Sequence, residues 1–318
     1  MKYAIISDIH GNLPALELVI KDANANDVDS FLFVGDYFLS NPFPDECMTK
    51  IRSIENKYII RGNEEAYLEN LVGKEQYTWT DGQMQISYYC YRAVSEENLK
   101  YVLSLPSTLN LSDHNVDIFI AHSSTEFIKD CEHKEWCSSQ LAKKYKTKAL
   151  TQGMLNSEIQ TYFDNDEKFR SVIRYMNSGV YIFGHSHIQW NWQSEDGKIT
   201  LINPGSCGLP LDGIKHSIPY TILDITDKGQ VLIYEKRIPF NMNEYINILR
   251  NSDQYEKANV WTKIIIQELN SGFEHLYFFL RYIDEYAEKI GDFRRPYAVD
   301  TWEKAYKLWN KEYNDVRI

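Results

Sequence analysis

Short apolar segments recur along the chain as far as residue 234, and each ends in small or polar residues. Within each segment the residues are continuously apolar, and many are β-branched or aromatic. This pattern is typical of strands that are buried on both faces, as in a layered α/β fold. The expected strands lie at residues 3–7, 31–35, 58–60, 117–121, 181–184, 199–203, 220–224 and 231–234.

An amphipathic helix is predicted between the first two strands. Asn12 is suited to cap its N-terminus, and Pro14 fits its first turn. Apolar residues then recur at helical spacing, at Leu13, Leu16, Ile20 and Ala23. The chain therefore opens with a β-α-β unit.

Three segments depart from the strand pattern. Residues 66–116 and 124–178 contain helix-like pieces, and we expect helical excursions packed on the flank of the sheet. The alternative for residues 124–178 is that part of them caps an active site. Residues 240–318 carry apolar stripes at helical spacing, so we expect a helical C-terminal extension, packed on a domain of residues 1–239 or at an oligomer interface.

Composition limits the classes of partner. The 318 residues include 34 Lys and Arg against 45 Asp and Glu, a net charge of −11, which argues against a long nucleic acid. A phosphorylated substrate would need something other than side-chain cations to neutralise it. No apolar run approaches the roughly 20 residues of a membrane span, and we see no signal peptide. The five cysteines are scattered and odd in number, so we expect them to be reduced thiols. Together these features predict a cytoplasmic protein without a membrane partner.

The most informative residues follow the predicted strands. Five strand ends each deliver an Asp, Asn or His at the point where the chain leaves the sheet, and ligands of open α/β folds bind at the carboxyl ends of strands. Any one of these residues alone is more often a cap or a turn residue. The full set is Asp8, His10, Asp36, Asn63, His122, His185 and His187.

The chemistry of this set indicates a metal centre. Imidazole, carboxylate and amide ligands together suit first-row transition metals. Seven groups would over-supply one ion, whereas two ions that share a carboxylate would use them all. Two-metal sites with ions about 3.5–4 Å apart catalyse phosphoryl transfer. Metal ions would also neutralise a phosphate within an acidic protein.

The motifs resemble those of the calcineurin-like metallophosphoesterase superfamily. The resemblance covers about residues 1–235, and the SDIHGN motif that begins at Ser7 is similar to that of the small bacterial phosphodiesterase branch, as is the NPGS motif at residues 203–206. The motifs that carry it are Asp8-x-His10, Gly35-Asp36, Gly62-Asn63, His122 and Gly184-His185-x-His187.

The resemblance implies a four-layer α/β/β/α sandwich, in which residues 1–239 form the catalytic domain. It also implies that Asp8, His10 and His187 hold one metal ion. Asn63, His122 and His185 would hold a second ion. Asp36 would bridge the two. Mn or Fe would be the metals, with Zn, Co or Ni as alternatives.

One motif departs from the family pattern. Glu64 stands where many members have a histidine that contacts the phosphate or protonates the leaving group. Glu64 would act as an acid only if its surroundings raised its pKa. Arg61 and Tyr37 are further candidates for substrate contact, although Arg61 also fits a surface charge and Tyr37 fits a packed turn residue.

These features predict a dinuclear phosphoesterase. A hydroxide that bridges the metals would attack phosphorus in line with the leaving oxygen of a small phosphodiester or nucleotide. One alternative is a phosphomonoesterase or protein phosphatase. Another is a catalytically silent, metal-binding regulatory or partner-binding protein on the same scaffold. A homo-oligomer formed through the C-terminal extension is a further expectation.

Overall fold

The computed structural model describes residues 1–128, 137–146 and 148–317, with side chains as far as residue 312. Two five-stranded sheets run through it, with strand orders β10-β9-β1-β2-β3 and β4-β5-β6-β8-β7. The strands of the first sheet are β1 (Lys2–Ile6), β2 (Ser30–Phe33), β3 (Lys57–Ile59), β9 (Ser217–Ile225) and β10 (Val231–Pro239). Those of the second are β4 (Thr108–Asp113), β5 (Val116–Ala121), β6 (Gly179–Ile182), β7 (Gln189–Gln193) and β8 (Ile199–Pro204).

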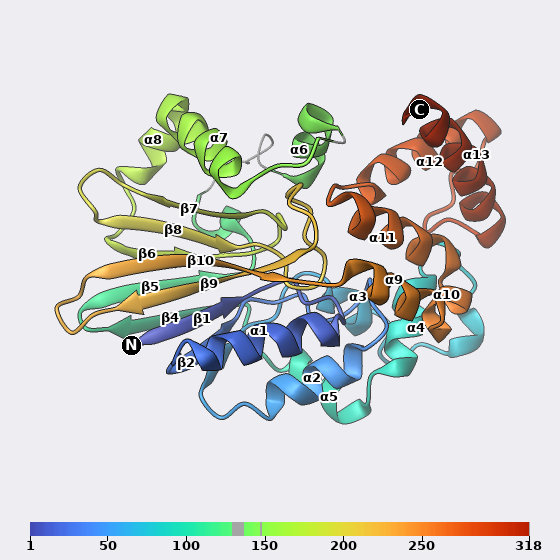
Figure 1. The fold of residues 1–318 in the computed structure, drawn as a ribbon. Helices are drawn as coiled ribbons and strands as arrows, with labels where there is room; N and C mark the ends of the chain where they lie inside the picture. The colour runs from blue at the N-terminus through green and yellow to red at the C-terminus, as the bar shows by residue number, and fades with distance from the viewer. Residues whose placement is uncertain (129–136, 147, 318) are drawn as a thin grey trace.

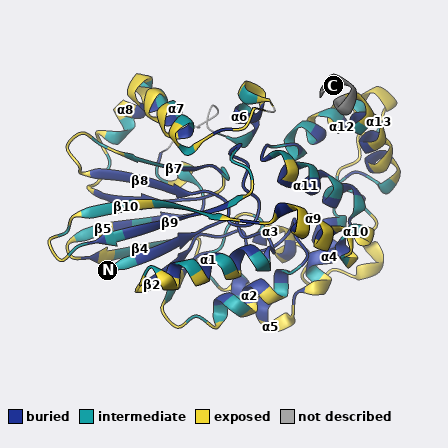
Figure 2. Cartoon of the chain, viewed as in Figure 1, coloured by how far each residue is buried: buried dark blue, intermediate teal, exposed yellow. Residues whose placement is uncertain are grey.

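The two sheets lie face to face between helices, and Figure 1 shows helices on both outer sides. In β1, Tyr3 and Ile5 belong to the apolar cluster between the sheets, together with Ile120 of β5. Ala4 and Ile6 face the other way, into the cluster beneath the first helical layer. The protein is therefore a four-layer α/β/β/α sandwich, and the buried strands at its centre (Figure 2) explain the continuous apolar runs in the sequence.

Helices cover both outer faces of the sandwich. Over the first sheet lie α1 (Leu13–Ala25), α2 (Pro44–Arg52), α4 (Gln85–Ala93) and α5 (Glu96–Leu103), with α3 (Glu65–Glu69) beside α4. Over the second lie α6 (Ser138–Tyr145), α7 (Gln152–Asn165) and α8 (Glu167–Ile173). The predicted cap of α1 forms, because the Asn12 side chain accepts a hydrogen bond from the Ala15 amide at 3.2 Å.

Two strands were not expected from the sequence. β4 lies within residues 66–116, which we predicted to be a helical excursion, and β7 follows the last histidine motif. Both are edge strands of the second sheet. Polar and apolar residues alternate in both, as Gln-Trp-Asn-Trp-Gln in β7 and as Thr-Leu-Asn-Leu at the start of β4, so a search for continuous apolar runs misses them. In the other excursion, residues 129–136 and 147 lie outside the described part of the chain.

After β10 the described chain is helical. The helices are α9 (Met242–Arg250), α10 (Asp253–Lys257), α11 (Asn259–Ser271), α12 (Leu276–Ile290) and α13 (Val299–Arg317). Tyr245 and Leu249 of α9 and Ile265 of α11 belong to the same apolar cluster as α1 and α2. Helices α12 and α13 enclose a separate cluster around Phe279 and Trp302. None of the described helices is long and apolar enough to cross a membrane.

Two neighbouring residues of α9 test how strongly this helix holds to the core. Leu249 is fully buried, whereas Ile248 is 38% exposed. We expect Leu249→Ala to lower the free energy of unfolding by about 2–5 kcal/mol, because it removes buried methyl groups and leaves a cavity. Ile248→Ala should change it by less than about 1 kcal/mol. Urea denaturation measures both, and equal effects would contradict the packing described here.

Candidate metal centre

The predicted ligand residues come from five loops at one end of the sandwich. Asp8 and His10 follow β1, and Asp36 follows β2. Asn63 follows β3 and His122 follows β5. His185 and His187 come after β6. Strands β1, β2 and β3 are parallel, as are β5 and β6, so their carboxyl ends bring these loops together.

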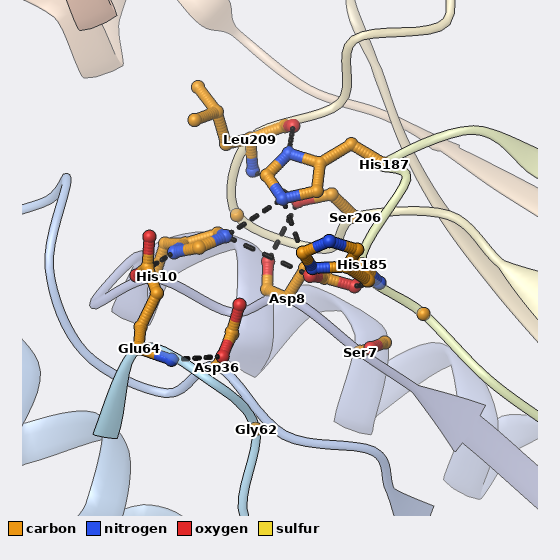
Figure 3. Close-up of polar contacts among 12 residues, drawn as sticks. Ser7, Asp8, His10, Asp36, Gly62, Glu64, His185, His187, Ser206 and Leu209 are labelled. Carbon is orange, nitrogen blue, oxygen red and sulfur yellow. Dashed lines mark hydrogen bonds and ion pairs between the residues drawn. The ribbon is translucent and has the colours of Figure 1, made fainter. Parts of the chain in front are cut away.

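Asp8, His10 and His187 form the first group, in which each side chain offers a ligand atom within 4.8 Å of the others. The Nε2 atoms of His10 and His187 are 3.0 Å apart. His187 Nε2 is also 3.3 Å from Asp8 Oδ1. Figure 3 shows the two rings facing one another above the Asp8 carboxylate.

Asp36, His122 and His185 form the second group, with ligand atoms within the same 4.8 Å limit. His122 Nε2 is 3.1 Å from Asp36 Oδ2. Asp36 also belongs to a third group with His10 and Glu64. The Asp36 carboxylate therefore lies between the two histidine pairs.

Asn63 is the seventh predicted ligand, and like His185 it is exposed. Its side chain is exposed at the rim of the centre, and within the described residues its amide makes no hydrogen bond. Six of the predicted residues, all of them Asp or His, thus lie in close groups, and Asn63 comes directly before Glu64 in the loop that reaches the centre.

Three histidines are held in one orientation by backbone carbonyl groups. The Nδ1 atom of His122 lies 2.6 Å from the carbonyl oxygen of Val34. The Nδ1 atom of His187 lies 2.8 Å from the carbonyl oxygen of Leu209. The Nδ1 atom of His10 lies 3.2 Å from the carbonyl oxygen of Phe38. A carbonyl only accepts, so each Nδ1 carries a proton, and each ring has its Nε2 on the side of the centre, where it would bind a metal ion in place of a second proton. This is the usual support of a histidine that binds a metal.

Two observations show that the residues fit metal ions. Asp8 Oδ1 and His122 Nε2 are buried, and their contacts with His187 Nε2 at 3.3 Å and with Asp36 Oδ2 at 3.1 Å do not have the geometry of a hydrogen bond, although buried polar atoms normally make one. The Nε2 atoms of His10 and His187 are 3.0 Å apart, so the metal-binding atoms of the two rings meet at one point. Two nitrogens that are each about 2.1 Å from one ion lie about 3.0–3.4 Å apart, so one cation would satisfy both.

The charges of the centre also favour a cation. Burial alone would raise the pKa of Asp8, but His187 and His122 outweigh it and hold that pKa below its usual range. Burial alone would lower the pKa of His122, but Asp36 and Asp8 outweigh it and raise that pKa to about 10. The buried carboxylates thus draw positive charge, which a proton supplies in the free protein and which a metal ion would supply by displacing it.

The backbone at the ligand positions is strained. Asp8, His10, Asp36, His185 and His187 all have a positive φ, between 50° and 67°, which non-glycine residues rarely adopt. Residues in such conformations persist only where the surrounding structure imposes them, and they cluster at functional sites.

Close approach of the loops explains why glycine occupies one position. A Cβ atom on Gly62 would lie 2.1 Å from Asp36 Oδ1 and 2.6 Å from the Asp36 amide nitrogen. The loops after β2 and β3 therefore meet without space for a side chain. Any other residue at position 62 would displace the Asp36 carboxylate.

Glu65 is a residue whose importance the sequence did not reveal. Its carboxylate is fully buried and accepts hydrogen bonds from the amides of Tyr37 at 2.8 Å, Gly62 at 2.7 Å and Asp36 at 3.3 Å. Burial and the neighbouring Asp36 raise its pKa to about 7. Glu65 therefore ties the loop that carries Asp36 to the loop that carries Asn63, and its only signal in the sequence was its place directly after Asn63 and Glu64.

The predicted substrate contacts have other partners in this structure. Tyr37 is fully buried, and its hydroxyl donates to the Ile60 carbonyl at 2.5 Å, so Tyr37 supports its loop instead of lining an open pocket. The Arg61 guanidinium is paired with Glu69 at 3.1 Å.

Glu64 contacts the metal centre directly. Its Oε2 lies 2.9 Å from His10 Nδ1, and its amide donates to Asp36 Oδ1 at 2.9 Å. Burial raises the pKa of Glu64 above its usual range, although the neighbouring His10 acts in the opposite direction.

Comparison with known proteins identifies the family. The model of the calcineurin-like phosphoesterase family matches residues 1–189, which is more than half of the chain. The chain therefore belongs to the calcineurin-like phosphoesterases. Membership makes a phosphoric ester hydrolase the supported class of enzyme and makes the clusters described above candidate ligands for the metal ions of such enzymes.

Individual relatives are distant. The uncharacterized protein MJ0912 of Methanocaldococcus jannaschii is 28% identical over 239 residues, which are 70% of this chain and 83% of that protein. The crystal structure of a metallophosphoesterase from Sphaerobacter thermophilus has a TM-score of 0.59 at 19% identity and covers 86% of this chain and 99% of its own. The crystal structure of the hypothetical protein PH1004 from Pyrococcus horikoshii has a TM-score of 0.56 at 14% identity, and the match covers 83% of this chain and 97% of that protein's chain. At these identities the structures show a common fold.

The role of Glu65 is tested by a matched pair of substitutions in α3. We expect Glu65→Ala to weaken Mn²⁺ binding by about 10–100-fold, because the amides that it holds position Asp36. Glu69→Ala should leave the affinity unchanged, since Glu69 is 49% exposed on its side chain and pairs with Arg61 alone among the described residues. Isothermal titration calorimetry with Mn²⁺ measures both, and equal affinities in the two variants would contradict the role of Glu65.

Proposed function

We propose that this protein hydrolyses a small phosphodiester or nucleotide with the help of two transition-metal ions, of which Mn and Fe are the favoured metals. The observation that supports this most strongly is the pair of adjoining ligand groups, with Asp36 between them, in a member of the calcineurin-like phosphoesterases. One ion would bind to Asp8, His10 and His187, and the other to His122, His185 and Asn63. Asp36 would bind both.

The residues of the centre prepare it for a phosphate only when cations are present. Asp8 and Asp36 are buried carboxylates, and Glu64 adds a third at their edge. Without cations, these three groups would repel a phosphodiester. Two bound cations would lower the pKa of a water molecule and offset charge on the phosphoryl oxygens. The histidines, oriented through their Nδ1 atoms, keep their Nε2 atoms directed at the ions.

The net charge of −11 bears on the size of the substrate. A long polyanion would meet this charge over its whole length, whereas a small ester meets the centre alone. We therefore favour a small substrate over a nucleic-acid strand.

Activity on a synthetic diester tests the proposal. With added Mn²⁺, the purified protein should hydrolyse bis(p-nitrophenyl) phosphate. Asp36→Asn and His122→Ala should each lower kcat/KM by at least about 100-fold, because each removes a ligand from the centre. His114→Ala is the matched control, since His114 pairs with Asp113 and Asp227 away from the five ligand loops.

Three results would count against the proposal. Activity that survives both ligand substitutions would place the chemistry elsewhere. Turnover of phosphomonoesters or phosphopeptides, but not of diesters, would favour the phosphomonoesterase or protein phosphatase. Bound metal, measured by elemental analysis, without turnover on any ester would favour the silent, partner-binding scaffold.

We assign Glu64 the role of positioning His10, and the 2.9 Å contact between Glu64 Oε2 and His10 Nδ1 supports this assignment. A carboxylate beside the second nitrogen of a ligating histidine fixes the orientation of the ring and makes it a stronger ligand. Proton donation to the leaving group is the competing role, and the two differ in how they depend on the leaving group.

Two substitutions of Glu64 separate these roles. Glu64→Gln keeps a hydrogen-bond acceptor for His10, so we expect a modest loss of kcat/KM, and Glu64→Ala should lose about 10-fold or more together with Mn²⁺ affinity. Both losses should be the same for p-nitrophenyl and phenyl esters. A loss in Glu64→Gln that is confined to the phenyl ester, the poorer leaving group, would instead identify Glu64 as the acid.

A further inference from the structure

A cavity of about 520 Å³ adjoins the second ligand group. Its lining includes Gly184 and His185 from the ligand loop after β6, together with Glu274, which precedes α12, and Tyr277 in the first turn of α12. Pockets for small molecules commonly measure about 300–1,000 Å³, so the cavity is large enough for an organic group attached to a phosphate. His185 belongs both to the lining and to the second ligand group, so the organic group of a phosphate ester bound there would lie beside the cavity.

The apolar part of the lining is aromatic. Phe183 and Trp190 are buried, with ring centroids 5.3 Å apart in an edge-to-face arrangement, and both belong to the core over the second sheet. Tyr277 is half-buried and adds a third ring. Phe183 and Trp190 thus form a rigid floor, and the more accessible ring of Tyr277 is the one that can pack against a planar group.

The polar part of the lining consists of hydroxyl groups and one carboxylate. Glu274 Oε2 accepts a hydrogen bond from Ser138 Oγ at 2.7 Å, and Glu274 Oε1 accepts one from the Tyr277 amide at 2.9 Å. Each carboxylate oxygen has a second lone pair, so Glu274 can accept from a ligand while it keeps both contacts. The hydroxyl groups are those of Ser123, Ser124, Thr125, Ser138, Ser139 and Ser186.

The charge of the lining limits the ligand. The described residues that line the cavity include neither Lys nor Arg, and Glu274 is their only carboxylate. A second phosphate in the cavity would face Glu274, whereas the Lys143 ammonium lies outside the lining, with its Nζ 5.6 Å from the centroid of the Tyr277 ring, so the carboxylate disfavours a second phosphate. The group that enters is therefore uncharged and carries hydrogen-bond donors.

We propose that this cavity binds the nucleoside-like part of the substrate, with its ring against the aromatic side chains and its hydroxyl or amino groups donating to Glu274. The inference rests on the proposed hydrolysis of a small phosphodiester. It assigns substrate selection to Glu274 and Tyr277, which lie beyond the residues that match the family model.

The turn that carries Glu274 is fixed to the rest of the molecule. The Gly213 amide donates to the Gly272 carbonyl at 2.8 Å, and Phe273, which is fully buried, packs into the core over the second sheet. A Cβ atom on Gly213 would lie 2.7 Å from the Phe273 ring, so the two segments are in direct contact. The cavity wall is thus held in place before any ligand binds.

Two diesters with the same leaving group test the inference in the Mn²⁺-loaded protein. One is the p-nitrophenyl ester of thymidine 5′-phosphate, and the other is methyl p-nitrophenyl phosphate. We expect the wild-type kcat/KM to favour the thymidine ester by about 10-fold or more, because only that ester fills the cavity.

Variants show which residues produce this preference. Tyr277→Ala and Glu274→Gln should each reduce the ratio of the two kcat/KM values by about fivefold. Tyr286→Ala, in the same helix but outside the cavity lining, is the matched control and should keep both the ratio and the rates. Glu274→Gln should also raise relative turnover of the thymidine ester with an added 3′-phosphate, a gain that loss of structure would not produce.

The outcomes distinguish the two proposals. If neither ester is hydrolysed, the proposed function fails. If both are hydrolysed equally well by the wild-type protein, or if the ratio is the same in Tyr277→Ala, Glu274→Gln and wild type, only the role of the cavity is overturned. The same holds if the 3′-phosphorylated ester gains nothing in Glu274→Gln.

Discussion

The Asp8 carboxylate is the group around which the rest of the structure is arranged. It is fully buried, and the Nε2 atoms of His187, His10 and His122 lie 3.3, 3.9 and 3.9 Å from its Oδ1 atom. A buried carboxylate is costly unless positive charge accompanies it. The two sheets meet this requirement by bringing the ends of parallel strands from both sides of the sandwich to one place.

This arrangement requires strained backbone conformations at the ligand residues. Five ligand residues adopt left-handed conformations, each of which costs on the order of 1 kcal/mol or more. The surroundings that impose them are hydrogen bonds between loops, such as those from the His10 amide to the Asp36 carbonyl and from the Asp8 amide to the Gly35 carbonyl. Burial of the apolar clusters on either side of each sheet provides the free energy of folding that offsets this strain.

Much of the fold could be predicted from the sequence, because central strands and ligand motifs are local signals. Continuous apolar runs such as residues 3–7 indicate a strand that is buried on both faces, and Asp8 directly follows this run. The edge strand β4 was not predicted, because its alternating pattern of polar and apolar residues resembles that of an exposed segment. The roles of Glu65 and Glu274 were not predicted for a different reason. Their hydrogen-bond partners include residues far away in the chain, and no spacing in the sequence indicates such contacts.

One segment of backbone serves both ends of the substrate site. The Leu209 carbonyl holds His187 Nδ1, and four residues later the Gly213 amide holds the turn before α12. Any ligand that shifts this segment changes the free energy at both places, and such coupling is reciprocal. Residues 209–213 are therefore one short stretch of backbone that contacts both a candidate metal ligand and the turn that forms part of the cavity wall. The turn before α12, although remote from the ligands in sequence, is thus joined by hydrogen bonds and a few residues of backbone to the loop that orients His187.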